Sequence, residues 1–210
     1  MSKLRLLDLF CGAGGAGMGY HRAGFEVVGV DINPQPHYPF EFHQADALTY
    51  PLDGFDAVHA SPPCQYNSWS ARRWRNTGRR YPDLVVPTLT LLQAAGLPFI
   101  CENVVGAPML NRIILCGTMF GLGVIRHRLF VSSALLFSAG DCRHRGSVKS
   151  GAYVTVAGHG GDGSARFDLW CAAMGIDWMD KRELTQAIPP AYTEFLGRQL
   201  LAVLAQREVA

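Results

Sequence analysis

Long apolar runs, paired cysteines and lysine are all scarce in this sequence of 210 residues. No apolar stretch approaches the roughly 18 residues that a membrane-spanning helix needs, so we expect no membrane partner. The first ten residues carry an acid inside their single apolar run, which is not the pattern of a secretory signal. We therefore expect a cytoplasmic protein.

The cysteines are spread singly along the chain, without a Cys-x-x-Cys pair. Because no secretory signal is evident, we expect free thiols in a reducing compartment. Each is then either a small core residue or a reactive one. Cys142 with His144, and His159 with Cys171, have a spacing that fits no standard zinc pattern, so we predict no metal site.

Acidic residues are absent from one strongly basic stretch, Arg72–Arg80, although the net charge of the chain is only +2. Sixteen of the 19 basic residues are arginines, and five of them lie in this stretch. Arginine suits planar, bidentate contacts with phosphates and bases, which favours a nucleic acid partner. The alternative is a disordered basic loop.

Apolar runs of strand length alternate with segments of helical spacing through the first half of the chain. This order predicts an α/β fold of βαβ units, with a mostly parallel sheet and helices on both faces. The expected strands are residues 4–10, 27–32, 55–61, 97–104, 112–117 and 126–131, and the expected helices are residues 15–24 and 83–95.

Glycine, serine, arginine and histidine dominate residues 138–164, where we expect a loop-rich insert with one strand at residues 153–157. Helices are expected at residues 167–174 and 192–206, the second opened by Pro189-Pro190. We therefore divide the chain into a main domain at residues 1–137, a reduced insert at 138–180, and a return to the main domain at 181–210.

A glycine-rich segment, DLFCGAGGAGMG, begins at Asp8 between the first expected strand and the first expected helix. Glycine there permits a tight turn and a close approach of the backbone to a ligand. Asp31 ends the next strand, where a carboxylate can accept hydrogen bonds from ribose hydroxyls. Asp46 lies at the expected end of a third strand, placed to meet an adenine amino group.

These features predict a cofactor that carries a nucleoside. Nicotinamide cofactors and S-adenosylmethionine both use this architecture, and Asp8 and Phe10 before the glycines favour the second. The alternatives are a glycine turn used only for packing and, for Asp46, an ordinary solvated acid.

Cys64 follows two prolines after an expected strand, and Glu102 ends another. The prolines stiffen the turn, and a rigid turn at the end of a strand suits a nucleophile. An acid in a buried strand can have a raised pKa, which suits a general acid. Arg126 and Arg128 alternate along a strand and could bind a carbonyl or a phosphate from one face. The alternatives are an inert core cysteine, a structural acid and an edge strand protected by charge.

Five motifs in this order resemble those of the DNA (cytosine-5) methyltransferases: DLFCGAGG, Asp31, the PPCQ segment at Cys64, the ENV segment at Glu102, and RHRLF at Arg126. RELTQAIPPAYTEFLG near the C-terminus resembles a shortened form of that family's closing motifs. The compact length is similar to that of solitary, phage-type members. The resemblance implies a Rossmann-like class I methyltransferase fold that uses S-adenosylmethionine.

The resemblance also implies a role for each site residue. Cys64 would be the nucleophile that adds to C6 of a flipped cytosine, Glu102 would hold N3 and the exocyclic amine, Arg128 would bind O2, and Arg126 would support the Cys64 loop or a phosphate. The implied cofactor contacts are Asp8, Phe10, Gly12, Gly14, Gly15, Asp31, Ile32, Asp46, Ala47 and Pro62. The implied DNA contacts are Gln65, Ser68, Arg72, Arg73, Arg75, Arg79, Arg80 and Asn103.

Three departures from the family pattern limit this interpretation. Val124 stands where the family usually has Gln before the arginine pair. Gln186-Ala187 replaces the usual Gly-Asn of the motif that helps to close the cofactor pocket in that family. Only about 50 residues separate RHRLF from RELTQ, too few for the usual recognition domain. We expect relaxed sequence specificity, a recognition partner or a homo-oligomer, or a smaller substrate such as RNA or a cytidine nucleotide. A catalytically inactive DNA-binding or cofactor-binding module is the non-enzymatic alternative.

Overall fold

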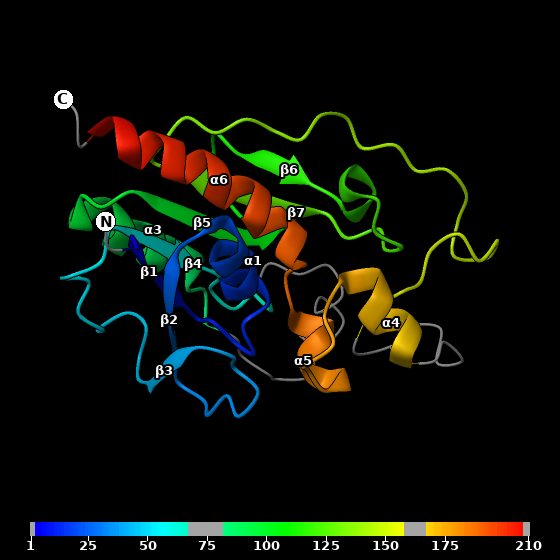
Figure 1. Ribbon diagram of the computed structural model, residues 1–210, viewed down its shortest axis with the longest axis horizontal. Helices are drawn as coiled ribbons and strands as arrows, with labels where there is room; N and C mark the ends of the chain where they lie inside the picture. The colour runs from blue at the N-terminus through cyan, green and yellow to red at the C-terminus, as the bar shows by residue number, and fades with distance from the viewer. Residues whose placement is uncertain (1–2, 67–81, 158–166, 208–210) are drawn as a thin grey trace.

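A sheet with helices on both faces forms the centre of the molecule (Figure 1). The computed structural model describes residues 3–66, 82–157 and 167–207. Within them the strand order is β3-β2-β1-β4-β5-β7-β6; β7 runs antiparallel to both of its neighbours, and the other pairs are parallel. The predicted α/β class with a mostly parallel sheet is therefore confirmed. The strands are β1 (Arg5–Leu9), β2 (Glu26–Asp31), β3 (Glu41–Gln44), β4 (Ala57–Ala60), β5 (Phe99–Val104), β6 (Ile113–Leu115) and β7 (Arg128–Ser132).

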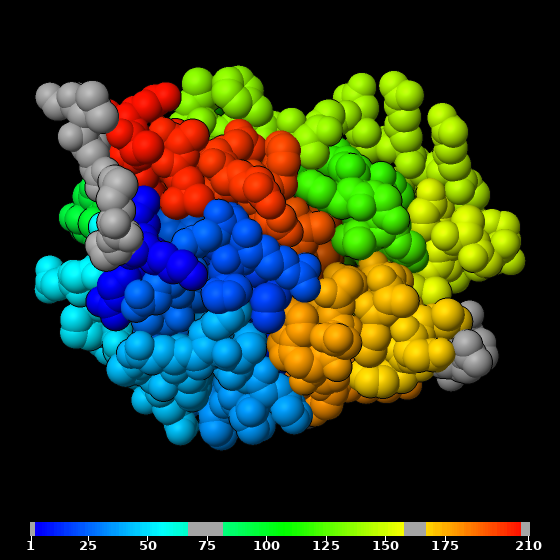
Figure 2. All heavy atoms as spheres, in the orientation of Figure 1, coloured from blue at the N-terminus to red at the C-terminus, as the bar shows by residue number. Residues whose placement is uncertain are grey.

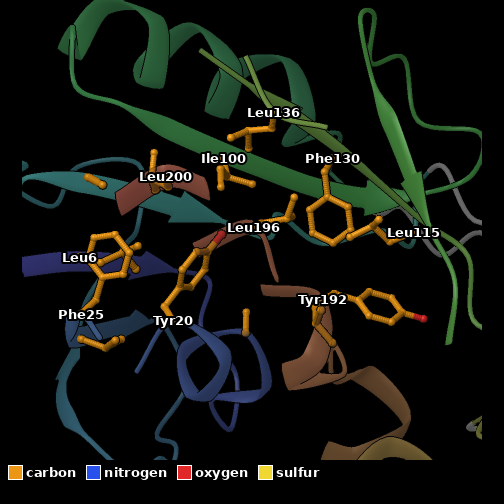
Figure 3. Packing of buried hydrophobic residues seen from close by; sticks show 14 of the residues in the cluster. Leu6, Tyr20, Phe25, Ile100, Leu115, Phe130, Leu136, Tyr192, Leu196 and Leu200 are labelled. Carbon is orange, nitrogen blue, oxygen red and sulfur yellow. The ribbon is translucent and has the colours of Figure 1, made fainter. Parts of the chain in front are cut away.

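The helices divide between the two faces because successive side chains of each strand point in opposite directions. Leu6 of β1 packs with residues of α1 and α6, and Figure 3 shows it near Tyr20 and Leu200. Leu7, its neighbour, belongs to a second core that includes Leu92 of α3. The helices are α1 (Gly15–Ala23), α3 (Val85–Ala95), α4 (Phe167–Met174), α5 (Lys181–Gln186) and α6 (Pro190–Arg207), with a short 3₁₀ helix η1 (Gly117–Phe120).

Helix α6 lies directly against α1, as Figure 2 shows on this face of the molecule. The Thr193 hydroxyl donates a hydrogen bond of 2.8 Å to the Ala16 carbonyl. A Cβ atom at Gly19 would collide with Thr193 and with the Pro190 carbonyl. Close contact between the two helices therefore requires glycine at this position, and it returns the C-terminal segment to the sheet.

A third core lies apart from the two faces of the sheet. Trp170 and Met174 of α4 and Leu184 of α5 pack there against Ala13 and Val124. Since Ala13 lies in the glycine-rich segment, this small core joins the C-terminal third of the chain to the predicted cofactor loop. None of the described helices is long and apolar enough to cross a membrane.

Two strand predictions need correction. Residues 153–157 form no strand, and Val154 makes only one isolated bridge, with Val124. The strand predicted at residues 126–131 begins at Arg128, so Arg126 lies outside the ladder and its side chain does not share a strand face with Arg128. The helices predicted at residues 167–174 and 192–206 match α4 and α6 within two residues, whereas α5 between them was not predicted.

Candidate active site

The glycine-rich loop leaves β1 through a tight series of left-handed residues. Phe10, Gly12 and Gly14 have φ angles of 57°, 49° and 84°. The loop is fixed at its base by a 3.1 Å hydrogen bond from the Cys11 amide to the Val30 carbonyl. A Cβ atom at Gly12 would meet nothing within 4 Å, whereas one at Gly14 would lie 2.8 Å from Pro39. The backbone at Gly12 therefore faces open space, into which a ligand can approach.

Asp31 holds this loop in place from the end of β2. Its carboxylate accepts hydrogen bonds from the Gly12 amide at 3.1 Å and from the Asn33 amide at 2.9 Å. The next residue, Ile32, is 66% exposed, which leaves an apolar side chain uncovered beside the loop. Because a carboxylate has about four lone-pair sites, Asp31 retains capacity for further donors.

Asp46 lies in the turn after β3, near the same edge of the sheet. Its carboxylate accepts a 2.9 Å hydrogen bond from the Leu48 amide, and the residue is exposed. Ala47, by contrast, is buried. Since β3, β2 and β1 are adjacent and parallel, their carboxyl ends place Asp46, Asp31 and the glycine loop along one edge. The structure thus brings these predicted cofactor residues together.

Asp8 is placed differently from the others, because it lies beneath the loop. It is fully buried, its Oδ2 accepts a hydrogen bond of 3.4 Å from the Tyr38 hydroxyl, and burial raises the pKa of its carboxyl well above the usual range. A Cβ atom at Gly17 would lie 2.9 Å from Asp8 Oδ2. Asp8 therefore supports the entry into α1 from below the loop, and direct contact with a cofactor stays a prediction.

The C-terminal segment borders the loop on its other side. The indole of Trp178 donates a 2.9 Å hydrogen bond to the Ala13 carbonyl. A Cβ atom at Gly15 would lie 2.5 Å from the Ile188 carbonyl oxygen. The altered closing motif around Ala187 therefore still packs on the start of α1. Sequence reasoning missed Trp178, since nothing local shows that a residue 165 positions away reaches the loop.

Cys64 occupies the loop that follows β4, and a buried amide holds that loop. Asn103 of β5 donates a 2.8 Å hydrogen bond from Nδ2 to the Pro62 carbonyl, and its Oδ1 accepts from the Val104 amide at 3.0 Å. The predicted contact of Asn103 with nucleic acid stays a prediction; in this structure its amide holds the Cys64 loop. The side chain is fully buried and both of its polar atoms are engaged. Pro62, predicted near the cofactor, is buried in the same arrangement.

Glu102 and Arg128 form an ion pair beside Cys64. Glu102 Oε1 lies 3.0 Å from Arg128 Nε, and the two side chains are 6% and 16% exposed. Burial raises the pKa of the Glu102 carboxyl even though Arg128, Ser61 and Arg126 each lower it. Adjacent strands carry the pair, because Val104 of β5 is registered with Arg128 of β7. A carboxyl whose pKa is raised in this way is suited to take up and give back a proton during a reaction.

The Cys64 thiol lies within the field of these charges. Burial and the Glu102 carboxylate raise its pKa, while Arg128 and Arg126 lower it less strongly. The free protein therefore holds Cys64 as a thiol. The two arginines are placed to stabilise the thiolate once a proton is removed, which is the form that acts as a nucleophile.

Arg126 is buried and holds two backbone carbonyls. Its guanidinium donates to the Val156 carbonyl at 3.1 Å and to the Thr185 carbonyl at 2.8 Å. Burial lowers the pKa of the Arg126 guanidinium to about 9. Contact with a phosphate, one of the two predicted roles, stays a prediction, and the side chain is only 7% exposed. The Arg126 charge still lowers the pKa of Cys64, which is consistent with the predicted role of Arg126 in supporting the Cys64 loop.

A buried hydrogen-bond network leads from Tyr20 to Glu102, and it could not be predicted from the sequence. The Tyr20 hydroxyl lies 2.9 Å from His59 Nδ1, and His59 Nε2 lies 2.8 Å from the Ser61 hydroxyl. Ser61 in turn hydrogen-bonds the Glu102 carboxyl. Burial lowers the pKa of His59 to about 3, so its imidazole is neutral. One ring nitrogen then donates a hydrogen bond while the other accepts one. A His among apolar residues in a strand was the available signal.

Most of the predicted DNA contacts lie outside the described residues, namely Ser68, Arg72, Arg73, Arg75, Arg79 and Arg80. Gln65 is described, and it is half-buried in the turn directly after Cys64. His159 of the weighed zinc set also lies outside the described residues.

Comparison with solved structures supports the architecture. The chain is similar to Schizosaccharomyces pombe Dnmt2 methyltransferase, with a TM-score of 0.63, 15% identity, and coverage of 97% of this chain and 99% of that one. It is also similar to the Entamoeba histolytica methyltransferase EhMeth, with a TM-score of 0.58, 13% identity and 99% coverage of both chains.

A third match is a protein described as a DNA modification methyltransferase encoded within an Escherichia coli prophage, with a TM-score of 0.44 and 23% identity. This match covers 61% of the present chain, which spans 45% of the prophage protein's length. No family model and no curated protein sequence matches the chain. The chain has the class I fold of these methyltransferases, as its motif order led us to expect.

Proposed function

We propose that this chain transfers a methyl group from S-adenosylmethionine to C5 of cytosine in DNA, with short or relaxed sequence specificity. The observation that carries the proposal is the convergence of Cys64, Glu102 and Arg128 on the sheet edge that also holds the glycine loop. A thiol, a protonatable carboxyl and a cation at one point match what a cytosine ring needs for attack at C6. The solved structures of methyltransferases with the same fold support this interpretation.

The residues at the glycine loop fit the proposed cofactor. Open space faces Gly12, Ile32 offers an exposed apolar surface, and Asp31 and Asp46 offer carboxylates along the same edge. Asp31 would accept from ribose hydroxyls and Asp46 from the adenine amino group, with Ile32 against the base. S-adenosylmethionine, when bound, supplies the methyl group as an electrophile.

The proposed chemistry uses Cys64 to activate the ring. The thiolate sulfur bonds to C6, the C5–C6 π electrons move toward C5, and Glu102 gives a proton to N3 so that charge does not build up. Arg128 pairs with O2. C5 then takes the methyl group, a water or weak base removes the C5 proton, and the C6–sulfur bond breaks. The electrons of the C5–H bond restore the C5–C6 double bond, the C6–sulfur pair leaves with sulfur as the thiolate, and N3 returns its proton to Glu102. In a duplex the base must first leave the stack.

Methyl transfer to candidate substrates tests this proposal. Tritiated methyl donor is offered with unmethylated duplex DNA, single-stranded DNA, RNA and dCMP, using wild type, Cys64→Ala and the matched variant Cys171→Ala on α4. Label at C5 of DNA cytosine in wild type and Cys171→Ala, but not in Cys64→Ala, is the expected result. Label in RNA or dCMP alone would replace DNA as the substrate. Binding of the donor without label anywhere would overturn the enzymatic assignment.

A further inference from the structure

Four metal-binding side chains come together behind the arginine strand, although they are dispersed in the sequence. Cys116 directly follows β6, His127 directly precedes β7, and Cys142 and His144 lie in the segment after β7. Their sulfur and ring nitrogen atoms all lie within 4.8 Å of one another. The spacing of Cys142 and His144 alone predicts no zinc site, because it does not show that Cys116 and His127 lie beside them.

Two of the separations between these ligand atoms match the edges of a small tetrahedron. Ligand atoms around tetrahedral zinc lie about 3.3–3.8 Å apart, given zinc–nitrogen and zinc–sulfur bonds of about 2.0 and 2.3 Å. Cys116 Sγ lies 3.5 Å from His144 Nε2, and Cys142 Sγ lies 3.4 Å from His127 Nε2. The separation of Cys142 Sγ and His144 Nε2 is shorter, at 2.7 Å, and His144 is exposed and can rotate outward.

The surroundings of the two sulfurs suit bound thiolates. The Thr118 hydroxyl lies 3.5 Å from Cys116 Sγ and 3.4 Å from Cys142 Sγ. Outer hydrogen bonds of this kind orient metal ligands and stabilise their charge. Cys116 is buried, and Cys142 and His127 are half-buried, so one ligand is shielded from water and two are partly shielded.

The location gives such a site a structural task. Residues 138–157 contain no helix or strand among those the structure describes, and Figure 1 shows them as an irregular trace outside the sheet. An irregular segment with few apolar contacts gains folding free energy from a metal crosslink. His127 lies between Arg126 and Arg128, and Arg126 donates to Val156 at the end of this segment. The crosslink would hold both arginines against the sheet.

We propose that Cys116, His127, Cys142 and His144 bind one Zn²⁺ ion in a closed tetrahedral site that fastens residues 138–157 to the sheet. Two thiolates and two imidazoles are a ligand set that selects zinc, and four protein ligands leave no open position for a catalytic water. The ion is therefore structural and takes no part in methyl transfer. This inference stands independently of the proposed substrate.

Metal analysis of the purified full-length chain tests the site. We expect one zinc per chain, and after removal of zinc with a chelator and addition of Co²⁺ we expect the visible and thiolate charge-transfer bands of tetrahedral cobalt. Cys142→Ser should lose both signals, and the matched Cys171→Ser should keep both. Zinc removal should lower Tm by about 5 °C or more, because metal binding is coupled to folding.

His144→Ala provides a second variant if Cys142→Ser does not fold, because His144 is exposed and its truncation spares the core. It should weaken zinc binding at least tenfold. The proposal would be overturned if the purified wild-type protein contained no zinc and showed no tetrahedral cobalt spectrum after addition of Co²⁺. A Cys116–Cys142 disulfide found by mass spectrometry in protein purified without oxidant would also overturn it.

Discussion

At the scale of single residues, Cys64 and Glu102 are two protonatable groups that share one environment. Burial raises the pKa of both the Cys64 thiol and the Glu102 carboxyl, and each feels the two arginines. In the free protein at neutral pH, the thiol keeps its proton. The proposed reaction needs one proton shared by Cys64 and Glu102. This proton moves from the Cys64 sulfur to Glu102, and from Glu102 to N3 of the ring.

The pH dependence of kcat/KM follows from this shared proton. Below the raised pKa of Glu102 the pair holds two protons, and above the raised pKa of Cys64 it holds none. We expect a flat profile between them, with an acid limb above the ordinary Glu range and a basic limb above the ordinary Cys range. Glu102→Gln should remove the acid limb and lower kcat by roughly 10²–10⁴-fold. A steady tenfold rise per pH unit through neutrality would contradict the shared proton.

Asn103 offers a test of how the Cys64 loop is positioned. Asn103→Ala removes the donor to the Pro62 carbonyl and leaves that buried group unpaired, which should cost about 1–3 kcal/mol of stability. We expect kcat to fall while the Kd for S-adenosylmethionine, measured by calorimetry, changes less than about twofold, because Asn103 does not line the glycine loop. Full activity in the variant, or an equal loss of cofactor affinity, would show that Asn103 does not position Cys64.

At the scale of elements, the carboxyl ends of adjacent strands assemble the site. The apolar runs and the glycine loop made these ends predictable, because parallel strands place them on one edge. The ladder did not include Arg126, whose backbone carbonyl accepts from Tyr192 and whose side chain turns to Val156 and Thr185. The alternation of arginines in the sequence cannot show these contacts of Arg126 with residues far away in the chain.

Gly12 and Gly96 provide a matched test of the cofactor loop. Both have a positive φ, 49° and 69°, and a Cβ atom at either would meet nothing within 4 Å. Alanine at each position should therefore cost a similar amount of stability, about 1–2 kcal/mol. Gly12→Ala should weaken S-adenosylmethionine binding at least tenfold by calorimetry, and Gly96→Ala, at the end of α3, should not. Equal affinities in the two variants would exclude close approach of the cofactor to Gly12.

At the scale of the whole molecule, three segments far apart in sequence meet around one edge of the sheet. The small core of α4 and α5 joins the glycine loop through Trp178, and α6 packs on α1. The sequence predicted the alternation of strands and helices in the first half of the chain and the position of the Cys64 loop after β4, but it did not predict α5. It did not reveal the Tyr20–His59–Ser61 chain or the four metal-binding side chains, because each depends on contacts between strands and loops that no local spacing encodes.

The class of substrate should appear in the salt dependence of binding. Each phosphate contact with duplex DNA contributes a slope of about −0.9 to log K against log salt, whereas a nucleotide releases few counterions. We expect DNA affinity, measured by fluorescence anisotropy, to fall steeply between low and physiological salt while dCMP binding stays weak. Salt-independent DNA binding, or dCMP binding as tight as DNA binding, would favour the nucleotide as the substrate.

The central claim is that Cys64 forms a bond to C6 of cytosine in DNA, and covalent trapping tests it most directly. DNA that contains 5-fluorocytosine cannot lose its C5 substituent, so the adduct should persist in the presence of S-adenosylmethionine. We predict a denaturant-resistant complex whose mass equals protein plus methylated DNA, with the crosslink mapped to Cys64, in wild type and Cys171→Ala but not in Cys64→Ala. The account would be contradicted if wild-type protein methylated ordinary DNA but formed no such complex. It would also be contradicted if the crosslink mapped to another residue.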